Sequence, residues 1–326
     1  MVIPPKYKLT NQIQKVLIKI ESLKLFLNES DIPPQAKNRA TKLGLLKSSL
    51  YSAKIEGNLL DIETAQYSRS KKKEDVFNIL EAIKYIEKNI KRNTPVTKKA
   101  ILDLHKIVMG REYTDVGKLR TQMEAIYNQF GQVVYIAPHP EEMENLVKKL
   151  TEYANKNDEH PLLKALITHL IFEKIHPFAD GSGRVGRLLI HTILKSRGYN
   201  FGFLVPFEEQ LNIKREEYYH ALDIGLKNPE RYLLFMLNNF YIQLKKTKED
   251  IFEEAKKEKN VLTLTFRQEE IYKILKEHKF ADFNFIKRRF LKVPDRTLRY
   301  DIKKLCDKNM IIKTGSTRGV IYKILD

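Results

Sequence analysis

The run of residues from Leu162 to Ile175 constrains the fold of this chain more than any other feature. Its apolar residues occur all round a helix instead of on one face, which indicates a helix buried at the centre of a domain. Pro161 precedes the run and suits the first turn of a helix, where its missing N–H is no loss. The rest of the domain must therefore pack around this central helix.

Helical periodicity also dominates the flanking sequence. Ile13, Val16 and Ile20 have the spacing of an amphipathic helix, which the Pro33–Pro34 pair ends. The next helix ends at Glu56–Gly57–Asn58, a sequence suited to a C-cap. Helices are predicted over residues 13–27, 35–55, 73–91, 98–109, 140–154 and 162–175. We therefore predict a mainly α-helical fold.

Two segments favour β-hairpins. In the first, Gln132–Ile136 follows a turn at Gly131. In the second, Met310–Lys313 and Val320–Ile324 flank a turn that contains two glycines. Between the hairpins, residues 245–260 are highly charged and lack a clear apolar face, so we predict a helix or linker there and a domain boundary near residue 260.

Composition excludes several classes of protein. The 326 residues include one cysteine, Cys306, which excludes an intramolecular disulfide or a cysteine-based zinc site. No apolar run approaches the ~18 residues of a membrane span, and the N-terminus lacks the apolar core of a signal peptide. We therefore expect a soluble cytoplasmic protein without a membrane partner.

The charge balance favours anionic partners. The chain has 59 Lys and Arg against 41 Asp and Glu, a formal net charge of +18. Nucleic acid or nucleotide phosphates would be attracted to such a field, although a lysine-rich surface without a specific partner has the same charge. The segment from Leu262 to Asp326 carries 16 basic and 8 acidic residues, which is nearly half of the excess in a fifth of the chain.

The strongest chemical signal is the segment His176–Arg187. A glycine-containing turn here opens a new helix, whose N-terminal N–H groups form an anion site. Arg184 and Arg187, three residues apart, can hold phosphate oxygens on one side of that helix. Asp180 is placed for a Mg²⁺ ion bound to those phosphates, and His176 can take a proton from a hydroxyl at neutral pH. Together these groups indicate phosphoryl or nucleotidyl transfer.

The segment has two other interpretations. The glycines at 181, 183 and 186 match a dinucleotide-binding fingerprint, but that fingerprint needs a preceding strand, and the preceding element is helical, so we reject it. A zinc site formed by His169, His176 and Asp180 is an alternative without any recognised ligand spacing.

The segment resembles the signature of the Fic family, His-x-Phe-x-(Asp/Glu)-Gly-Asn-Gly-Arg-x-x-Arg, and differs from it only at Ser182, where the family usually has asparagine. The resemblance extends from about Lys98 to Tyr241 and includes Gly117–Thr121 and Glu217–Leu222. It implies a Fic-like helical core with a short β-hairpin flap. It also implies Mg²⁺-dependent transfer of AMP from ATP to a Ser, Thr or Tyr hydroxyl of a target protein, with release of pyrophosphate.

The resemblance assigns a role to each matching position. His176 would deprotonate the target hydroxyl, Asp180 would hold Mg²⁺, and Arg184 and Arg187 would hold the β- and γ-phosphates. Nucleotide binding would involve Gly181, Ser182, Gly183, Arg184, Arg187, Tyr218, Ile126, Tyr127 and Asn128. In this set the amides of Gly181, Ser182 and Gly183 form the anion hole, Tyr218 lies near the adenine, and the flap at 126–128 pairs with the target strand.

Two positions depart from the family pattern. Ser182 shortens the side chain that usually reaches toward the nucleotide but keeps its main-chain N–H. Leu226 stands where the family often offers an asparagine to the nucleotide. The nucleotide preference is therefore less well defined by the sequence than phosphate binding.

An upstream segment resembles the inhibitory motif of the same family, (Ser/Thr)-x-x-x-Glu-(Gly/Asn). Ser52 and Glu56 fit it, and their spacing places both on one face of a helix. The resemblance implies that Glu56 pairs with Arg187 and so denies this arginine to the γ-phosphate. The competing interpretation is an exposed glutamate at a helix end.

The C-terminal region has a different pattern. Thr265 and Gln268 form a capping box that begins a helix, a second helix covers about 283–290, and a third follows Pro294. With the second hairpin, these helices resemble a winged helix-turn-helix. Four basic residues point outward from the third helix, as in a helix that contacts DNA: Arg296, Arg299, Lys303 and Lys304. A protein-binding winged helix with a solvated basic face is the alternative.

We therefore predict four parts: an N-terminal helical region (1–95), a Fic catalytic core (96–241), a charged linker helix (242–260) and a winged helix-turn-helix domain (261–326). The expected partners are ATP, a target protein that can be the enzyme itself, and DNA. The competing functions are a DNA-binding regulator whose core binds nucleotide, or an enzyme that transfers another nucleotide or phosphate group or removes AMP. The sequence leaves the oligomeric state open.

Overall fold

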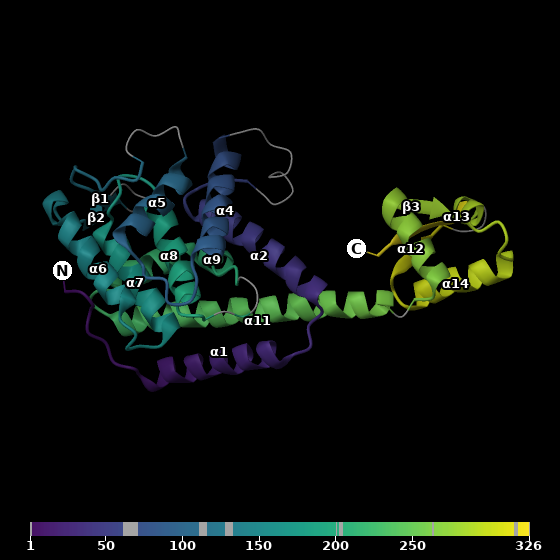
Figure 1. Cartoon of the computed structure of the whole chain (residues 1–326), viewed down its shortest axis with the longest axis horizontal. Coiled ribbons are helices and arrows are strands. Elements are labelled where there is room, and N and C mark those ends of the chain that lie inside the picture. The colour runs from purple at the N-terminus through teal and green to yellow at the C-terminus, as the bar shows by residue number, and fades with distance from the viewer. Residues whose placement is uncertain are drawn as a thin grey trace. The chain divides into compact units, whose positions relative to one another are not determined.

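The computed structural model describes residues 2–60, 71–110, 116–127, 133–199, 201, 205–262, 264–315 and 319–325. The chain forms two compact units, Met1–Ile251 and Phe252–Asp326. Helices make up most of the described residues in both units, which confirms the mainly α-helical fold class (Figure 1).

The predicted helices of the first unit are all present. Its helical elements, the last of which continues beyond the unit, are α1 (Asn11–Glu29), α2 (Pro34–Ile55), α4 (Lys71–Asn89), α5 (Lys98–Met109), η1 (Pro140–Glu142), α6 (Met143–Asn155), α7 (Pro161–Ile175), α8 (Ser182–Ser196), α9 (Glu208–Ile213), α10 (Arg215–Ile224) and α11 (Pro229–Leu262). The helix predicted over 140–154 begins as the 3-10 turn η1, with Pro140 in its first turn.

Helix α7 lies at the centre of the first unit, as its all-round apolar pattern predicts. Every residue from Leu162 to Ile175 is buried, and α7 packs against α6 and α8. The approach to α8 is close, because a Cβ atom on Gly186 would lie 2.0 Å from Oε1 of Glu173. Among the helices that the structure describes, α7 included, none combines the length and the apolar character that crossing a membrane needs.

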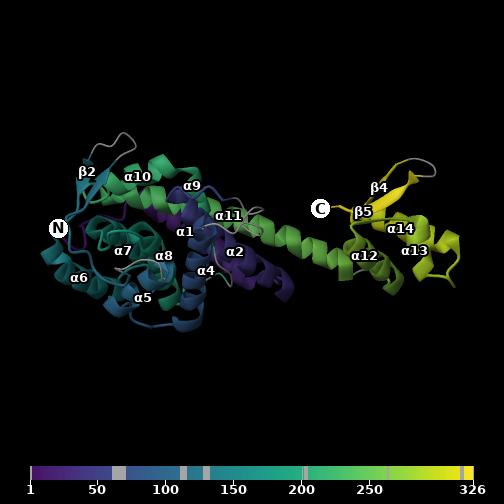
Figure 2. The ribbon, with the colours of Figure 1, turned by 90° about the horizontal axis from the view of Figure 1, so that it is seen from above.

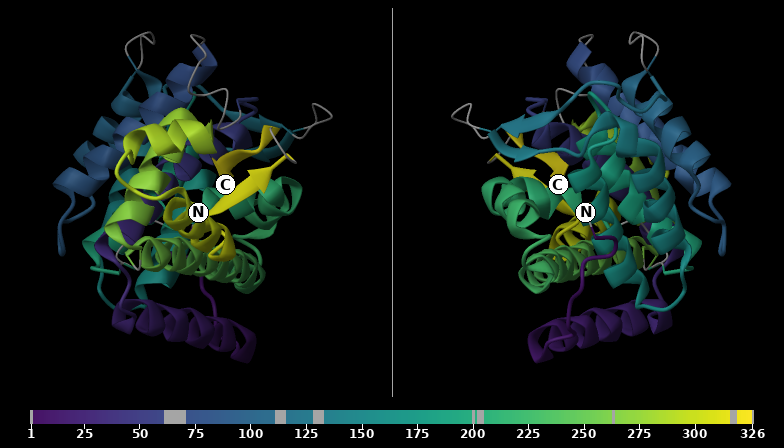
Figure 3. Two further views of the ribbon diagram at one scale, coloured as in Figure 1. Left: turned by 90° about the vertical axis from the view of Figure 1, so that its right-hand side faces the viewer. Right: turned by 90° about the vertical axis from the view of Figure 1, so that its left-hand side faces the viewer.

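The N-terminal helices α1 and α2 cover the central pair of helices, α7 and α8. Helix α1 lies on the outside of the first unit along α11 (Figures 1 and 3), where Nζ of Lys248 is 4.4 Å from the ring centroid of Phe26. Helix α2 packs against α4, α8 and α9, and Figure 2 shows α2 and α4 side by side. The C-terminal end of α2 is thereby brought to the same part of the unit as the N-terminal end of α8.

A short antiparallel hairpin joins β1 (Ala125–Tyr127) and β2 (Val133–Ile136), which confirms the first predicted hairpin. Ala125 pairs with Ile136 and Ile126 pairs with Tyr135, and the register shifts between Ile126 and Tyr127. The predicted turn at Gly131 lies outside the described residues.

The second unit contains a small sheet and three packed helices. Its elements are α12 (Phe266–His278), β3 (Phe280–Asp282), α13 (Phe283–Arg289), α14 (Asp295–Asp307), β4 (Ile311–Thr314) and β5 (Ile321–Ile324). The predicted capping box of Thr265 and Gln268 is present at the start of α12. The core is formed by residues such as Ile271, Leu275, Ile286, Leu298 and Leu305.

Strand β3 is absent from the sequence prediction. It pairs with β5, which gives an antiparallel sheet in the order β3-β5-β4 instead of the two-stranded hairpin expected. Three residues are too few to show an alternating pattern, and the pairing comes from a strand about 40 residues away. The charged segment at 245–260 is helical and belongs to α11.

Candidate active site

His176 lies in the loop between the two buried helices α7 and α8. It directly follows α7 and has left-handed backbone angles, φ 48° and ψ 64°, which are uncommon for a residue with a side chain. Its N–H donates to the carbonyl of Phe172 at 2.9 Å and so extends the helix by one bond. Burial lowers the pKa of the imidazole, and the nearby carbonyl of Glu173 partly offsets this. The ring is therefore neutral at pH 7, the form that accepts a proton.

The turn into α8 presents free N–H groups. Gly181 has a φ of +81°, and a Cβ atom there would lie 2.7 Å from Sδ of Met109, so both the angle and the space require glycine. The N–H of Gly181 donates to Oδ1 of its neighbour Asp180 at 2.6 Å. The N–H groups of Ser182 and Gly183, in the first turn of α8, have no acceptor among the described residues. Two of the three predicted anion-binding amides are therefore free.

The side chain of Ser182 is used within the loop. Its hydroxyl donates to the carbonyl of Phe178 and accepts from the N–H of the same residue, both at 3.1 Å. Ser182 is 1% exposed. The departure from the family asparagine therefore leaves a residue that closes the loop and keeps its free amide.

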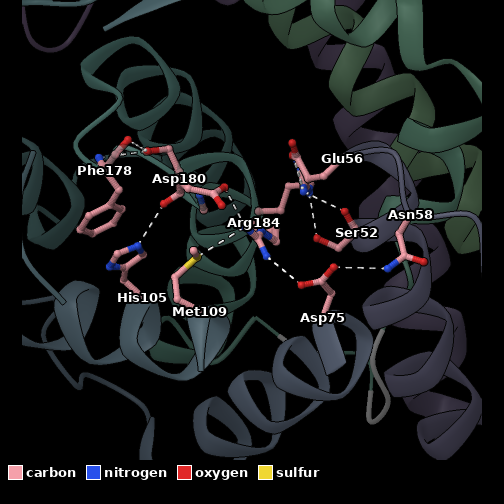
Figure 4. A network of polar contacts seen from close by, with 12 residues as sticks. Ser52, Glu56, Asn58, Asp75, His105, Met109, Phe178, Asp180 and Arg184 are labelled. Carbon is pink, nitrogen blue, oxygen red and sulfur yellow. Dashed lines mark hydrogen bonds and ion pairs between the residues drawn. The ribbon is translucent and has the colours of Figure 1, made fainter. Parts of the chain in front are cut away.

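The guanidinium of Arg184 is held by two carboxylates from different elements (Figure 4). It donates to Oδ1 of Asp180 at 2.8 Å and lies 3.4 Å from Oδ1 of Asp75, a residue of α4. Asn58 also reaches Asp75, at 3.5 Å. Two carboxylates of the protein therefore compensate the charge of this guanidinium.

Arg187 is held in the same way by the end of α2. It is 1% exposed and donates to the hydroxyl and the carbonyl of Ser52, each at 3.0 Å, and to Oε1 of Glu56 at 2.9 Å. Burial opposes the charge on Arg187, but nearby groups, with Glu56 the largest contributor among them, together outweigh it and raise the pKa of the guanidinium. A Cβ atom on Gly183 would lie 2.5 Å from Oε1 of Glu56, so this glycine makes room for the carboxylate. The ion pair implied by the two sequence motifs is present.

Three buried polar side chains, from α7 and α10, lie close together. Tyr218 is 1% exposed, and its hydroxyl lies 2.8 Å from Nε2 of His169. Nδ1 of His169 is 3.6 Å from Oε1 of Glu173. Burial raises the pKa of Glu173 to about 8 and lowers that of His169 to about 3, so both are neutral at pH 7. Tyr218, predicted near an adenine, therefore lies in the protein interior in this state.

The remaining predicted nucleotide contacts are only partly described. The backbone of Ile126 and Tyr127 forms β1, and no strand in the described part of the chain pairs with its other edge. Asn128 lies outside the described residues. Leu226 lies in the turn after α10.

The zinc alternative finds no support in this geometry. Among the described residues, no group of three or more His, Cys, Asp or Glu side chains is arranged to hold a metal ion. His169 is enclosed in the interior with Tyr218, whereas the side chain of Asp180 is 58% exposed at the entrance of the site. The exposed carboxylate of Asp180 suits Mg²⁺, which commonly keeps its waters and binds through one or two carboxylates and the substrate phosphates.

Residues 95–194 match the family described as Fic/DOC. This stretch of the chain is therefore similar to Fic domains. Curated relatives named protein adenylyltransferase Fic are 30% identical in Drosophila mojavensis and in Drosophila melanogaster, over 58% of this chain. The match covers 38% and 39% of those proteins, so this chain spans about two fifths of the length of the relatives it matches.

Solved structures share the fold. A Fic family protein from Desulfovibrio desulfuricans superposes with a TM-score of 0.71 at 20% identity, over 98% of each chain. Fic-1 from C. elegans superposes with a TM-score of 0.62 at 20% identity, over 74% of this chain and 73% of that one. The fold similarity therefore extends beyond the matched domain.

Three further residues support the candidate site: Arg120 lies in the stretch Gly117–Thr121 that resembles the family, whereas His105 and Asp75 were not singled out from the sequence. His105 on α5 accepts from the N–H of Gly117 at 2.9 Å and bonds the carbonyl of Asp180 at 3.0 Å, and its ring stacks on Phe178. Asp75 reaches Arg184, and Arg120 reaches the carbonyl of His176. None of the three belongs to the His176–Arg187 segment, and nothing in the local pattern around them indicates their partners.

The second unit carries the predicted basic residues on one exposed face of α14. This α14 basic stripe consists of Arg296, Arg299, Lys303 and Lys304. No acidic side chain among the described residues lies within salt-bridge distance of any of the four. Exposed Tyr300 lies on the same face, and the guanidinium of Arg299 stacks 3.8 Å from the ring centroid of Phe283.

Proposed function

We propose that the protein is a protein adenylyltransferase, which transfers AMP from ATP to a hydroxyl group of a target protein. The observation that carries the proposal is the placement of a neutral imidazole, His176, beside a helix N-terminus with free amides and two arginines. The names of the Drosophila relatives support the same reaction class.

In the proposed reaction, the target hydroxyl oxygen attacks the α-phosphorus of ATP. A bond forms between that oxygen and phosphorus, the bond to the β-phosphate oxygen breaks, and pyrophosphate leaves. His176 accepts the hydroxyl proton. The free amides of α8 hold phosphate oxygens, and Arg184 and Arg187 hold the β- and γ-phosphates. Asp180 would hold Mg²⁺, which when bound neutralises phosphate charge.

We further propose that Glu56 restrains this activity. The γ-phosphate and the Glu56 carboxylate need the same guanidinium, that of Arg187, which is almost completely enclosed. ATP can therefore take its productive position only when the end of α2 releases Arg187. A coupling of this kind is typically about 1–3 kcal/mol, a factor of about 5–150.

The test uses purified wild type and Glu56→Gly with Mg²⁺ and ATP labelled at either the α- or the γ-phosphate. Covalent label on protein, including the enzyme itself, is measured, with His176→Ala as the blank. We expect label from α-ATP only, increased about 10-fold or more in Glu56→Gly and absent in the blank. Glycine should be accepted at position 56 because the residue caps α2 and lies outside its last turn.

The control is Glu29→Gly, which removes an exposed acidic residue from the end of α1 and should leave the label unchanged. Equal label in wild type and Glu56→Gly would contradict the restraint but not the transfer. Label from γ-ATP alone would replace adenylyl transfer with phosphate transfer. No label in Glu56→Gly with either nucleotide or with a target-containing extract would favour a regulator without transferase activity.

A second candidate function concerns the second unit, which we propose is a winged helix that binds DNA. The order of its elements, with three helices followed by the β4–β5 hairpin, is that of a winged helix-turn-helix, and the unpaired α14 basic stripe supports contact with phosphates. The test is fluorescence anisotropy of labelled duplex DNA with the full chain at increasing salt. Binding that weakens steeply with salt supports the proposal, and no binding at low salt would sink it.

A further inference from the structure

A buried arginine outside the signature joins the loop of His176 to the β1–β2 hairpin. Arg120 is 6% exposed. Its Nε donates to the carbonyl of His176 at 2.8 Å, its Nη1 to that of Gln122 at 2.7 Å and its Nη2 to that of Pro138 at 2.6 Å. The N–H of Arg120 also donates to the carbonyl of Pro177, at 2.9 Å. Within the described residues, every hydrogen bond of its guanidinium therefore goes to backbone.

The C-terminal end of α7 explains why a cation is placed there. The last carbonyls of a helix have no partner within it and form the negative end of the helix dipole. Nη2 of Arg120 also lies 3.5 Å from the carbonyl of Ile175, the last residue of α7. Among the described residues, no acidic side chain lies within salt-bridge distance of Arg120. Carbonyl dipoles therefore compensate this buried charge. Contact with several carbonyls at once requires the rigid, planar set of donors that a guanidinium provides.

The other two acceptors belong to the ends of the hairpin. Gln122 shortly precedes β1, and Pro138 shortly follows β2. A second bond, from the Tyr135 hydroxyl of β2 to the carbonyl of Lys174 at 2.9 Å, joins the hairpin to the same end of α7. The contacts of Arg120 and Tyr135 therefore hold the hairpin against the same end of α7 that carries the backbone of His176.

We propose that Arg120 is a positioning residue, whose guanidinium holds the backbone of His176 at a set distance from the β1–β2 hairpin. A hydroxyl presented along the hairpin then meets the imidazole in one geometry. This inference rests on the proposed function, because it takes His176 as the base and the hairpin as the place where the target lies. A misplacement of about 1 Å can cost about 10²-fold in rate.

Arg120 also acts on His176 through its charge. Apart from burial, the pKa of His176 is raised by the carbonyl of Glu173 and by Glu56 and Asp180, and it is lowered by Arg120. A variant without the positive charge should therefore raise this pKa. Since the neutral imidazole is the active form, the acidic limb of the rate profile should move to higher pH.

The experiment compares Arg120→Gln and Arg120→Lys, both in the Glu56→Gly background. Arg120→Gln should lower kcat about 10²-fold, leave KM for ATP unchanged and move the acidic limb to higher pH. Arg120→Lys keeps the charge but not the fork, so kcat should fall while the limb stays in place. The matched control is Arg197→Gln, because Nη2 of Arg197 donates to the carbonyls of Ala154 and Lys156 at the end of α6, both at 2.8 Å.

A titration of His176 by NMR separates this inference from the proposed function. If Glu56→Gly transfers no label, the proposed function fails, and the titration alone then decides whether Arg120 acts on His176. An unshifted His176 titration in Arg120→Gln, or a loss of kcat equal to that of Arg197→Gln, would overturn the role of Arg120. Circular dichroism spectra matching the parent protein establish that each variant is folded.

Discussion

The basic residues of the two units occupy opposite environments. In the first unit, three arginines are 6%, 8% and 1% exposed, and protein groups hold each of them: Arg120, Arg184 and Arg187. In the second unit, the α14 basic stripe is exposed, and within the described residues no acidic side chain pairs with it. These three arginines are therefore held by protein groups, whereas the four residues of the α14 basic stripe are exposed to solvent.

The difference follows from the cost of removing a charge from water. A buried guanidinium needs partners, so the fold must supply carboxylates or carbonyls, and any ligand must displace them. An exposed lysine or arginine needs none and can meet a phosphate without rearrangement, although each contact contributes little. Ligand binding to a buried arginine can therefore be controlled by the protein groups that hold it, whereas ligand binding to an exposed basic residue depends mainly on salt concentration.

The largest contrast should be in stability. Arg187→Ala removes the donor for Ser52 and Glu56 and leaves a void, and we expect a loss of about 2–4 kcal/mol, reduced by the partial exposure of Glu56 to solvent. Arg296→Ala should change stability by less than about 0.5 kcal/mol. Urea unfolding followed by circular dichroism measures both. Similar losses in the two variants would remove the distinction between the units.

DNA affinity should show the opposite pattern: substitutions in the exposed stripe should have the large effect, and substitution of the buried Arg187 should have none. Arg296→Ala and Lys303→Ala should each weaken DNA binding about 10-fold at 0.1 M salt and reduce the slope of log affinity against log salt by about one. Arg187→Ala should leave DNA affinity unchanged. Anisotropy titrations over a salt series provide the slope, and an unchanged slope in both α14 variants would mean that the stripe does not contact phosphate.

Titration of the buried groups gives a third contrast. Burial raises the pKa of Glu173 to about 8 from its ordinary 4.5, so the folded protein keeps a proton that the unfolded chain loses over this range. Stability should therefore fall as pH rises from about 4.5 to about 8. Glu173→Gln should remove this fall and gain stability relative to wild type at pH 8. The control is Glu269→Gln, which changes a 45% exposed side chain on α12; thermal unfolding that depends on pH equally in all three proteins would contradict the prediction.

The candidate site around His176, Arg184 and Arg187 was only partly predictable from the sequence. Helix α7 and the His176–Arg187 turn follow from local pattern, because periodicity and glycine spacing act over a few residues. Glu56 and Arg187 lie 131 residues apart, yet their pairing could be inferred because each lies in a recognisable motif. The contacts of Arg120 with His176, 56 residues away, and of Asp75 with Arg184, 109 residues away, could not. No periodicity encodes them, since they arise only when separate helices pack.

Asp75 offers the smallest and most specific test of the comparison. Its carboxylate is 3.4 Å from Arg184, whereas Glu56 is 2.9 Å from the more enclosed Arg187, so the interaction of Asp75 should be the weaker of the two. Asp75→Asn should therefore increase ATP affinity only about two- to five-fold, with no change in the position of the Arg187 pair. Isothermal titration with ATP and Mg²⁺, in the wild-type and Glu56→Gly backgrounds, measures the effect. The gain should be the same in both backgrounds if the two arginines are occupied independently. A gain confined to Glu56→Gly would mean that the nucleotide reaches Arg184 only after the end of α2 has moved.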